Sequence, residues 1–206
     1  MTIITIGSLS VSAQSQRYPT NVEIQQIIRE FQQRASSPAY SRECCGGTEA
    51  DTRTAAQRQP LESFVKVWSR VDPTVSPFLG WWTNNDGDIG VYPSNVRGRV
   101  CVIRASLGPS YKFSVASISR GKISLSGDLT GRVLLNQRTP IGNTFLLVAY
   151  VGSDNTARAE PGSDIYTYPQ LPQAPTKLPL SKTNPQEISR VIREFNAAGC
   201  TVSLPK

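Results

Sequence analysis

The chain has 206 residues, a formal net charge of +7, a pI of about 9.5 and no histidine. Without histidine, the Ser-His-Asp and Cys-His catalytic arrangements, most zinc sites and the commonest general base are excluded. The length suits one structural domain that buries a sizeable core. Only 18% of the residues are charged, below the usual quarter, and uncharged polar residues supply much of the surface, which favours an exported protein.

Residues 1–14 have apolar and small side chains and contain Val11-Ser12-Ala13, which fits a signal-peptide cleavage site. The basic region that begins a signal peptide is absent, and the apolar part is too short to cross a bilayer. We interpret residues 1–14 as a signal-peptide remnant, with a flexible or strand-forming N-terminus as the alternative. The predicted localisation is secreted, periplasmic or lumenal, and we expect no transmembrane segment elsewhere.

Residues 15–76 predict an N-terminal flank of helices and loops. After Asn21, apolar residues recur at helical spacing, and a second helix is expected over residues 61–70. The two apolar stripes consist of Ile24, Ile27, Ile28 and Phe31, and of Leu61, Phe64, Val65 and Trp68. Between the helices, residues 35–60 are rich in small and polar side chains and are expected to be irregular.

Residues 77–168 predict an antiparallel β domain. Residues 111–116 alternate, with Tyr111, Phe113 and Val115 on one face. Arg120-Gly121 and Asp86-Gly87 are hairpin signals, and the continuously apolar residues 145–150 are typical of a strand covered on both faces. About seven strands are expected, with residues 165–168 as an edge strand. The fold class is mainly β with flanking helices (α+β), a small antiparallel β-barrel or sandwich buttressed by about three amphipathic helices.

The start of this domain, Phe78-Leu79-Gly80-Trp81-Trp82, resembles the G-x-W signature of lipocalins and related calycin barrels. In that family the motif tryptophan packs across the closed end of the barrel, and this role would fall to Trp82. The domain is short for an eight-stranded barrel, and the usual C-terminal helix followed by a last strand is hard to place. In overall style the chain is also similar to secreted proteins of cyanobacteria, which implies a compartment and no activity.

Residues 169–206 predict a Pro-rich strap and a C-terminal helix, packed with the rest as one structural domain. Pro169, Pro172 and Pro175 have the spacing of polyproline II. We interpret them as an extended strap, with a ligand for a partner domain as the alternative. Asn184-Pro185-Gln186-Glu187 is a helix start, and Gly199 marks the helix end.

The four cysteines are Cys44, Cys45, Cys101 and Cys200. They lack C-x-x-C spacing and histidine is absent, so the sequence predicts no metal site, and it gives no sign of a cofactor. An even number of cysteines in an exported protein favours up to two disulfides. Because adjacent cysteines rarely bond to each other, we expect one of Cys44 and Cys45 to bond to Cys101 and the other to Cys200. In a cytosolic protein the adjacent pair would instead be a candidate redox or metal site.

The leading hypothesis is an exported, non-enzymatic binding protein that holds a small apolar or amphipathic ligand in the β-barrel or in a groove. Aromatic residues of the β domain are the candidate ligand-binding residues, and plain core packing is their alternative role. They are Trp81, Trp82, Tyr92, Tyr111, Phe113 and Tyr150. The sequence identifies no catalytic residue, and we lean against an enzyme.

A second hypothesis is an envelope or extracellular interaction protein. Arginine supplies most of the positive charge, and an Arg-rich surface could hold a partner protein or an acidic polysaccharide. Nucleic acid is disfavoured because no dense basic run exists and Lys112 alternates to the face opposite Tyr111 and Phe113.

A third hypothesis is a carboxylate-based hydrolase, which needs two carboxylates across a cleft. Asp86 or Asp88 with Asp128 are the candidates. Residues 84–88 also carry oxygen-containing side chains at alternate positions, as a calcium-binding loop does. The segment lacks the glycine and glutamate that an EF-hand requires, and a hairpin turn explains its composition.

Overall fold

The computed structural model describes residues 17–36, 51–84, 86–106, 110–138, 143–159, 165–178 and 185–205. The interpretation of residues 1–14 as a signal-peptide remnant falls outside these ranges, as do Cys44 and Cys45. The α-helices within them are α1 (Asn21–Ala35), α3 (Ala55–Val71) and α4 (Pro185–Ala197). Helix α3 begins earlier than the apolar spacing predicts, because Thr54 and Gln57 form a capping box at its N-terminus.

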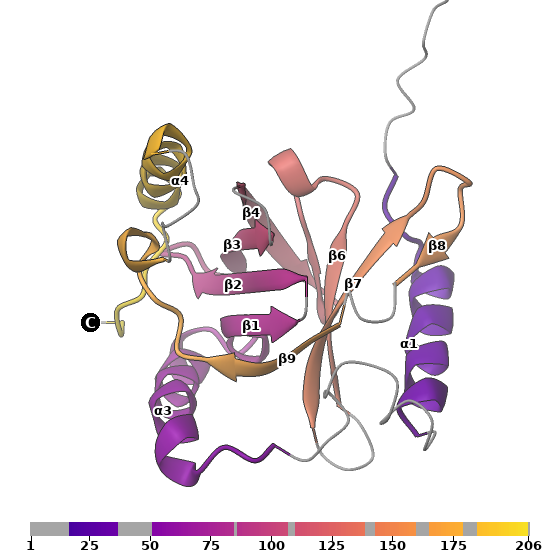
Figure 1. Cartoon of the computed structure of the whole chain (residues 1–206), viewed down its shortest axis with the longest axis horizontal. Helices are drawn as coiled ribbons and strands as arrows, with labels where there is room; N and C mark the ends of the chain where they lie inside the picture. The colour runs from indigo at the N-terminus through magenta and orange to yellow at the C-terminus, as the bar shows by residue number, and fades with distance from the viewer. Residues whose placement is uncertain are drawn as a thin grey trace, which may run out of the picture.

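The strands of the described residues form one antiparallel sheet in the order β6-β5-β4-β3-β2-β1-β9-β7-β8. An additional pairing of β6 with β7 closes eight of them into a barrel, and β8 extends the sheet beside β7 (Figure 1). They are β1 (Gly80–Asn84), β2 (Gly87–Pro93), β3 (Arg99–Ser106), β4 (Tyr111–Ser119), β5 (Lys122–Ser124), β6 (Val133–Arg138), β7 (Thr144–Val151), β8 (Ala157–Arg158) and β9 (Ile165–Gln170). The predicted fold class, a mainly β barrel with flanking helices, is confirmed.

Strand β9 corrects the expectation of an edge strand over residues 165–168. It pairs with β1 through Thr83 and Thr167, and with β7 through Leu147 and Ile165. A strand that is bonded on both sides leaves no open edge at that place, so β9 is the strand that closes the barrel.

The barrel has two ends, which we name by the elements that cover them. At the α3 end, β1 begins and the β2–β3, β4–β5 and β6–β7 connections turn; α3 and the 3₁₀ helix η1 (Ser76–Phe78) pack there. At the η2 end, the β1–β2, β3–β4 and β5–β6 connections turn. The last of these contains the 3₁₀ helix η2 (Gly127–Leu129), and it buries Leu125 and Leu129 in the interior.

Apolar side chains fill the barrel between these two ends. Each inward-facing core residue is at most 3% exposed, a value typical of a packed interior. They are Trp82, Ile89, Val91, Val100, Val102, Ala116, Ile123, Leu134, Leu146, Val148 and Tyr166.

Helices α1 and α4 cover two separate parts of the outer face of the barrel (Figure 1). Helix α1 packs on β6 and β7, where the Phe31 ring contacts Phe145 edge-on at 5.4 Å. Helix α4 packs on β2, β3 and β4, where Phe195 contacts Tyr92 edge-on at 5.0 Å. Strands β2 to β4, β6 and β7 therefore bury side chains on both faces, as the continuous apolar run of β7 predicts.

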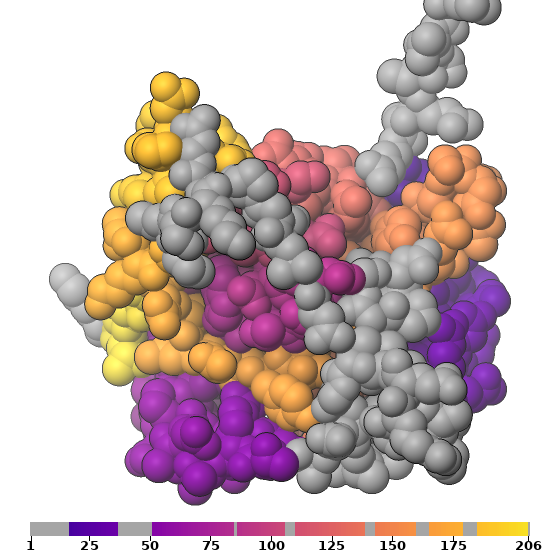
Figure 2. Space-filling view, viewed as in Figure 1, coloured from indigo at the N-terminus to yellow at the C-terminus, as the bar shows by residue number. Residues whose placement is uncertain are grey.

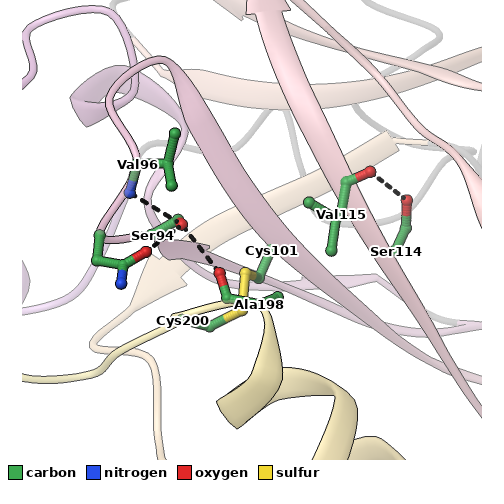
Figure 3. The surroundings of a disulfide bond; sticks show 8 residues. Ser94, Val96, Cys101, Ser114, Val115, Ala198 and Cys200 are labelled. Atoms are coloured by element: carbon green, nitrogen blue, oxygen red, sulfur yellow. Dashed lines mark hydrogen bonds between the residues drawn. A yellow bond between two sulfur atoms is a disulfide. The ribbon is translucent and has the colours of Figure 1, made fainter.

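A disulfide between Cys101 and Cys200 joins β3 to the segment after α4 (Figure 3). This finding overturns the predicted pairing of Cys44 and Cys45 with Cys101 and Cys200. The cause is local backbone pairing, because Asn95 donates its N–H to Gly199 and Ser94 forms a β-bridge with Cys200. The bridge brings Cys200 against the outer face of β3, where Cys101 lies.

We expect the double variant Cys101→Ser, Cys200→Ser to lose about 4 kcal/mol of unfolding free energy, because the bond closes a long loop of the unfolded chain. The two cysteines are 99 residues apart. Urea unfolding, followed by tryptophan fluorescence, measures the loss. A reducing agent should bring the wild-type midpoint to that of the double variant and leave the variant unchanged. Equal midpoints for the oxidised wild type and the variant would contradict the assignment.

Candidate functional site

A groove of about 400 Å³ opens at the α3 end of the barrel, between α3, β9 and the adjoining ends of β6 and β7; we call it the α3–β9 groove. Figure 2 shows α3 (purple) and β9 (orange) side by side on one face of the molecule. The described residues that line the groove are Asp51, Arg53, Arg58, Leu61, Glu62, Val65, Arg138, Asn143, Thr144, Thr167, Tyr168 and Pro169.

Helix α3 and β9 supply the apolar part of the lining. Leu61 and Val65 lie one helical turn apart and are half-buried, so both point from α3 to the same side. On β9, Tyr168 has a positive φ of 48°, and the register with β1 shifts beside it. This irregularity places Tyr168 and Pro169 in the groove lining.

Arg53 fixes the segment before α3 against β9. Its Nε and Nη2 donate to the two carboxylate oxygens of Asp51 at 2.9 and 2.8 Å, and its Nη1 donates to the carbonyl of Pro169 at 2.6 Å. The guanidinium also lies 5.7 Å from the ring centroid of Tyr168. The hydrogen bonds from Arg53 lower the pKa of the Asp51 carboxyl, which therefore stays ionised and is a poor general acid.

Two further guanidinium groups lie in the groove. Arg58 donates to the carbonyl of Arg53 and approaches Glu62 at 3.6 Å, in a pair that is largely exposed. Arg138 is exposed at the end of β6 and forms no ion pair with another described residue. Three arginines therefore face two carboxylates, and Arg138 is accessible to an anionic group that enters the groove.

A second cavity, of about 430 Å³, also lies at the α3 end, and its lining includes Pro73, Thr74 and Arg120. The buried carboxylate of Asp72 holds this region together. It accepts hydrogen bonds from the N–H and hydroxyl of Thr74 and from the N–H of Gly98. Burial alone would raise the pKa of Asp72, but these hydrogen bonds outweigh it and lower the pKa.

The structure does not bring the six predicted ligand-binding aromatics into one pocket. Trp82 lies inside the barrel and donates its Nε1–H to the carbonyl of Phe78 at 2.9 Å. Tyr150 lies near Arg132 and Arg158, whose guanidinium groups are 5.8 and 6.0 Å from its ring centroid. The other four pack on the outer face of the barrel in the cluster beneath α4: Trp81, Tyr92, Tyr111 and Phe113. Their assignment to a ligand stays a prediction.

The sequence offered little signal for the residues of the groove. Arg53 and Arg58 fall in a segment expected to be irregular, and Arg138 ends a strand far along the chain. The positive charge of the chain was the only pointer to an anion site. For the hydrolase hypothesis, Asp128 lies 3.5 Å from Arg190 of α4 in an ion pair. Among the described residues, no cluster of three or more Cys, Asp or Glu side chains could hold a metal ion.

The fold and the groove define a closed antiparallel β-barrel with flanking helices and a surface hollow at one end. No family model matches the chain, and no curated protein or solved structure shows significant similarity to it. None of the described helices is both long and apolar enough to span a membrane.

We expect Asp72→Asn to lower the unfolding free energy by about 2 kcal/mol at pH 7, because an amide replaces a charged acceptor of buried hydrogen bonds. A lowered pKa means that the carboxylate stabilises the fold above the pKa of the unfolded chain, and that this stabilisation is lost as the pH falls through the folded pKa. The difference between the urea midpoints of the two proteins should therefore stay constant from pH 7 to about pH 4, near the pKa of an unfolded Asp, and should shrink as the pH falls further towards pH 2. A difference that stays constant down to about pH 2 would refute the assignment.

Proposed function

We propose that the protein is a non-enzymatic binding protein that holds a small amphipathic molecule with an anionic head group in the α3–β9 groove. The observation that carries the proposal is the mixed lining of this groove. Leu61, Val65 and Pro169 offer apolar surface, and Arg58 and Arg138 offer positive charge beside it. Small-molecule sites commonly combine a mainly apolar lining of several hundred Å³ with a few charged groups that orient the ligand.

The groove supports this function better than the barrel interior does. The largest inward-facing side chains, Trp82 and Tyr166, are each 1% exposed and fill the centre of the barrel. A ligand inside would have to displace them, at the cost of close packing. A ligand in the groove would displace neither of these side chains.

The charges of the groove select the class of ligand. Asp51 already occupies the fork of Arg53, so this ion pair acts as a rigid wall. Arg138 forms no ion pair with another described residue, and Arg58 shares its charge with the largely exposed Glu62. A carboxylate, sulfonate or phosphate head would approach Arg138 while its apolar part covers Leu61 and Val65.

We further propose that the barrel is lipocalin-like and that the protein is exported. Trp82 packs with Phe78 and Leu79 at the α3 end, which agrees with the place of the motif tryptophan in the family that Gly80-Trp81-Trp82 resembles. The disulfide between Cys101 and Cys200 supports an oxidising compartment.

Binding of 8-anilinonaphthalene-1-sulfonate, an aromatic anion whose fluorescence rises in apolar sites, tests the proposal. We expect saturable binding to the folded protein and an affinity about fivefold lower for Arg138→Gln, because one exposed charge-assisted contact contributes about 1 kcal/mol. The uncharged N-phenyl-1-naphthylamine should bind both proteins equally.

The matched control is Arg97→Gln, which removes an exposed arginine that lines neither cavity. It should leave the affinity for the sulfonate unchanged. Thermal unfolding confirms that both variants fold. If the sulfonate does not saturate, or if Arg97→Gln weakens binding as much as Arg138→Gln, the groove is not the site.

A further inference from the structure

Two basic residues lie directly opposite each other on the inner side of the barrel wall, at the η2 end. In the register of β3 and β4, Arg104 is paired with Lys112. Side chains alternate along a strand, and Val102 on β3 and Ala116 on β4 belong to the interior cluster. Arg104 and Lys112 therefore continue the inward-facing rows beyond the apolar core, and both are half-buried.

Neither side chain forms a hydrogen bond or ion pair with another described residue. On the neighbouring strand β2, Ile89 is the residue opposite Arg104. The nearby carboxylate of Asp88 is opposite Ala105, whose side chain packs in the outer cluster beneath α4, so Asp88 faces the other side of the sheet. Among the described residues of β2, β3 and β4, no carboxylate therefore faces the two cations.

This arrangement costs stability. Directly opposite residues of an antiparallel pair have Cβ atoms about 5 Å apart, and like charges in such a pair are destabilising. A half-buried Lys and Arg also lose hydration that no hydrogen-bond acceptor among the described residues replaces. Elsewhere in the barrel, the inward positions of β3 and β4 carry Val100, Val102 and Ala116, with Ser114 as the one polar side chain, so Arg104 and Lys112 are the only charged residues in these two rows.

We propose that Arg104 and Lys112 form a second binding site, for a tetrahedral oxyanion such as a phosphate or sulfate group. Two cations at this separation can both donate to one anion, and a tetrahedral group offers acceptor oxygens in several directions. Arg132 adds positive charge at the same end of the barrel, beside the ring of Tyr150. The site is at the opposite end from the α3–β9 groove and does not depend on the function proposed for it.

Backbone NMR titration with inorganic phosphate, at low and constant ionic strength, tests this site. We expect saturable shifts of the amides around residues 103–105 and 111–113, and affinities at least tenfold weaker for Arg104→Gln and for Lys112→Gln. The control Arg97→Gln should bind phosphate as the wild type does. Uniform shifts over the surface, or equal affinities in all variants, would overturn the proposal.

Thermal unfolding gives a second readout that a purely structural role would not produce. Without anion, Arg104→Gln and Lys112→Gln should melt at or above the wild-type temperature, because repulsion is relieved. Phosphate should raise the melting temperature of the wild type and not of these variants. If both variants melt lower and phosphate has no selective effect, the pair is structural and the proposal fails.

Titration with inorganic sulfate, phenyl phosphate and phenyl sulfate distinguishes the sources of the anionic group. Tighter binding of a phenyl ester than of the free ion shows that the site takes the group as part of a small molecule. Equal affinities for the phenyl ester and the free ion show that the site binds the free ion. Sodium chloride at matched ionic strength should not displace the free ion or the phenyl ester from the site. Full displacement by chloride would contradict a specific oxyanion site.

Discussion

The pairing of β9 with both β1 and β7 is the constraint on which the rest of the structure depends. It requires a glycine at the start of β1, because a Cβ on Gly80 would lie 2.9 Å from the Cβ of Pro169 on β9. Gly80 also has a φ of +146°, which other residues rarely adopt. Because Gly80 allows β9 to pair with β1, the sheet closes into a barrel, and Trp82 and Tyr166 bury their rings inside it. Without the pairing of β9, β1 and β7 would each present an unpaired edge.

Closure also creates the surfaces on which function is proposed. Helix α3 leads into β1, and its Trp68 donates to the carbonyl of Ser203, so the helix is held between the barrel end and the C-terminal segment. The α3–β9 groove exists because this helix lies beside the closing strand without filling the space between them. At the η2 end, strands β3 and β4 extend beyond the apolar core, and their inward-facing residues there are Arg104 and Lys112. One packed barrel thus carries both surfaces that are proposed to accept an anion, the α3–β9 groove and the pair of Arg104 and Lys112.

Much of the fold could be predicted because local patterns repeat with the right period. The alternation of Tyr111, Phe113 and Val115, the turn at Arg120-Gly121 and the apolar run of β7 each specify an element from neighbouring residues alone. Alternation does not say which face is inside. Here the aromatic face of β4 lies outward beneath α4, whereas the face with Lys112, Ser114 and Ala116 lies inward. Both faces of β4 are covered, so hydrophobicity along the strand could not decide between them.

The sequence by itself determined the kinds of element in the molecule: the amphipathic helices and short antiparallel strands of the described residues, a positive net charge and no histidine-based chemistry. Only the tertiary structure decided which distant segments meet. It paired Cys101 with Cys200, turned the expected edge strand into the closing strand, and brought Arg53 and Arg138 into one groove. The physical reason is how far apart in the sequence the interacting residues lie. Helix caps, turns and side-chain periodicity depend on residues a few positions apart, whereas barrel closure, disulfide partners and grooves depend on contacts whose free energy appears only when the whole chain packs.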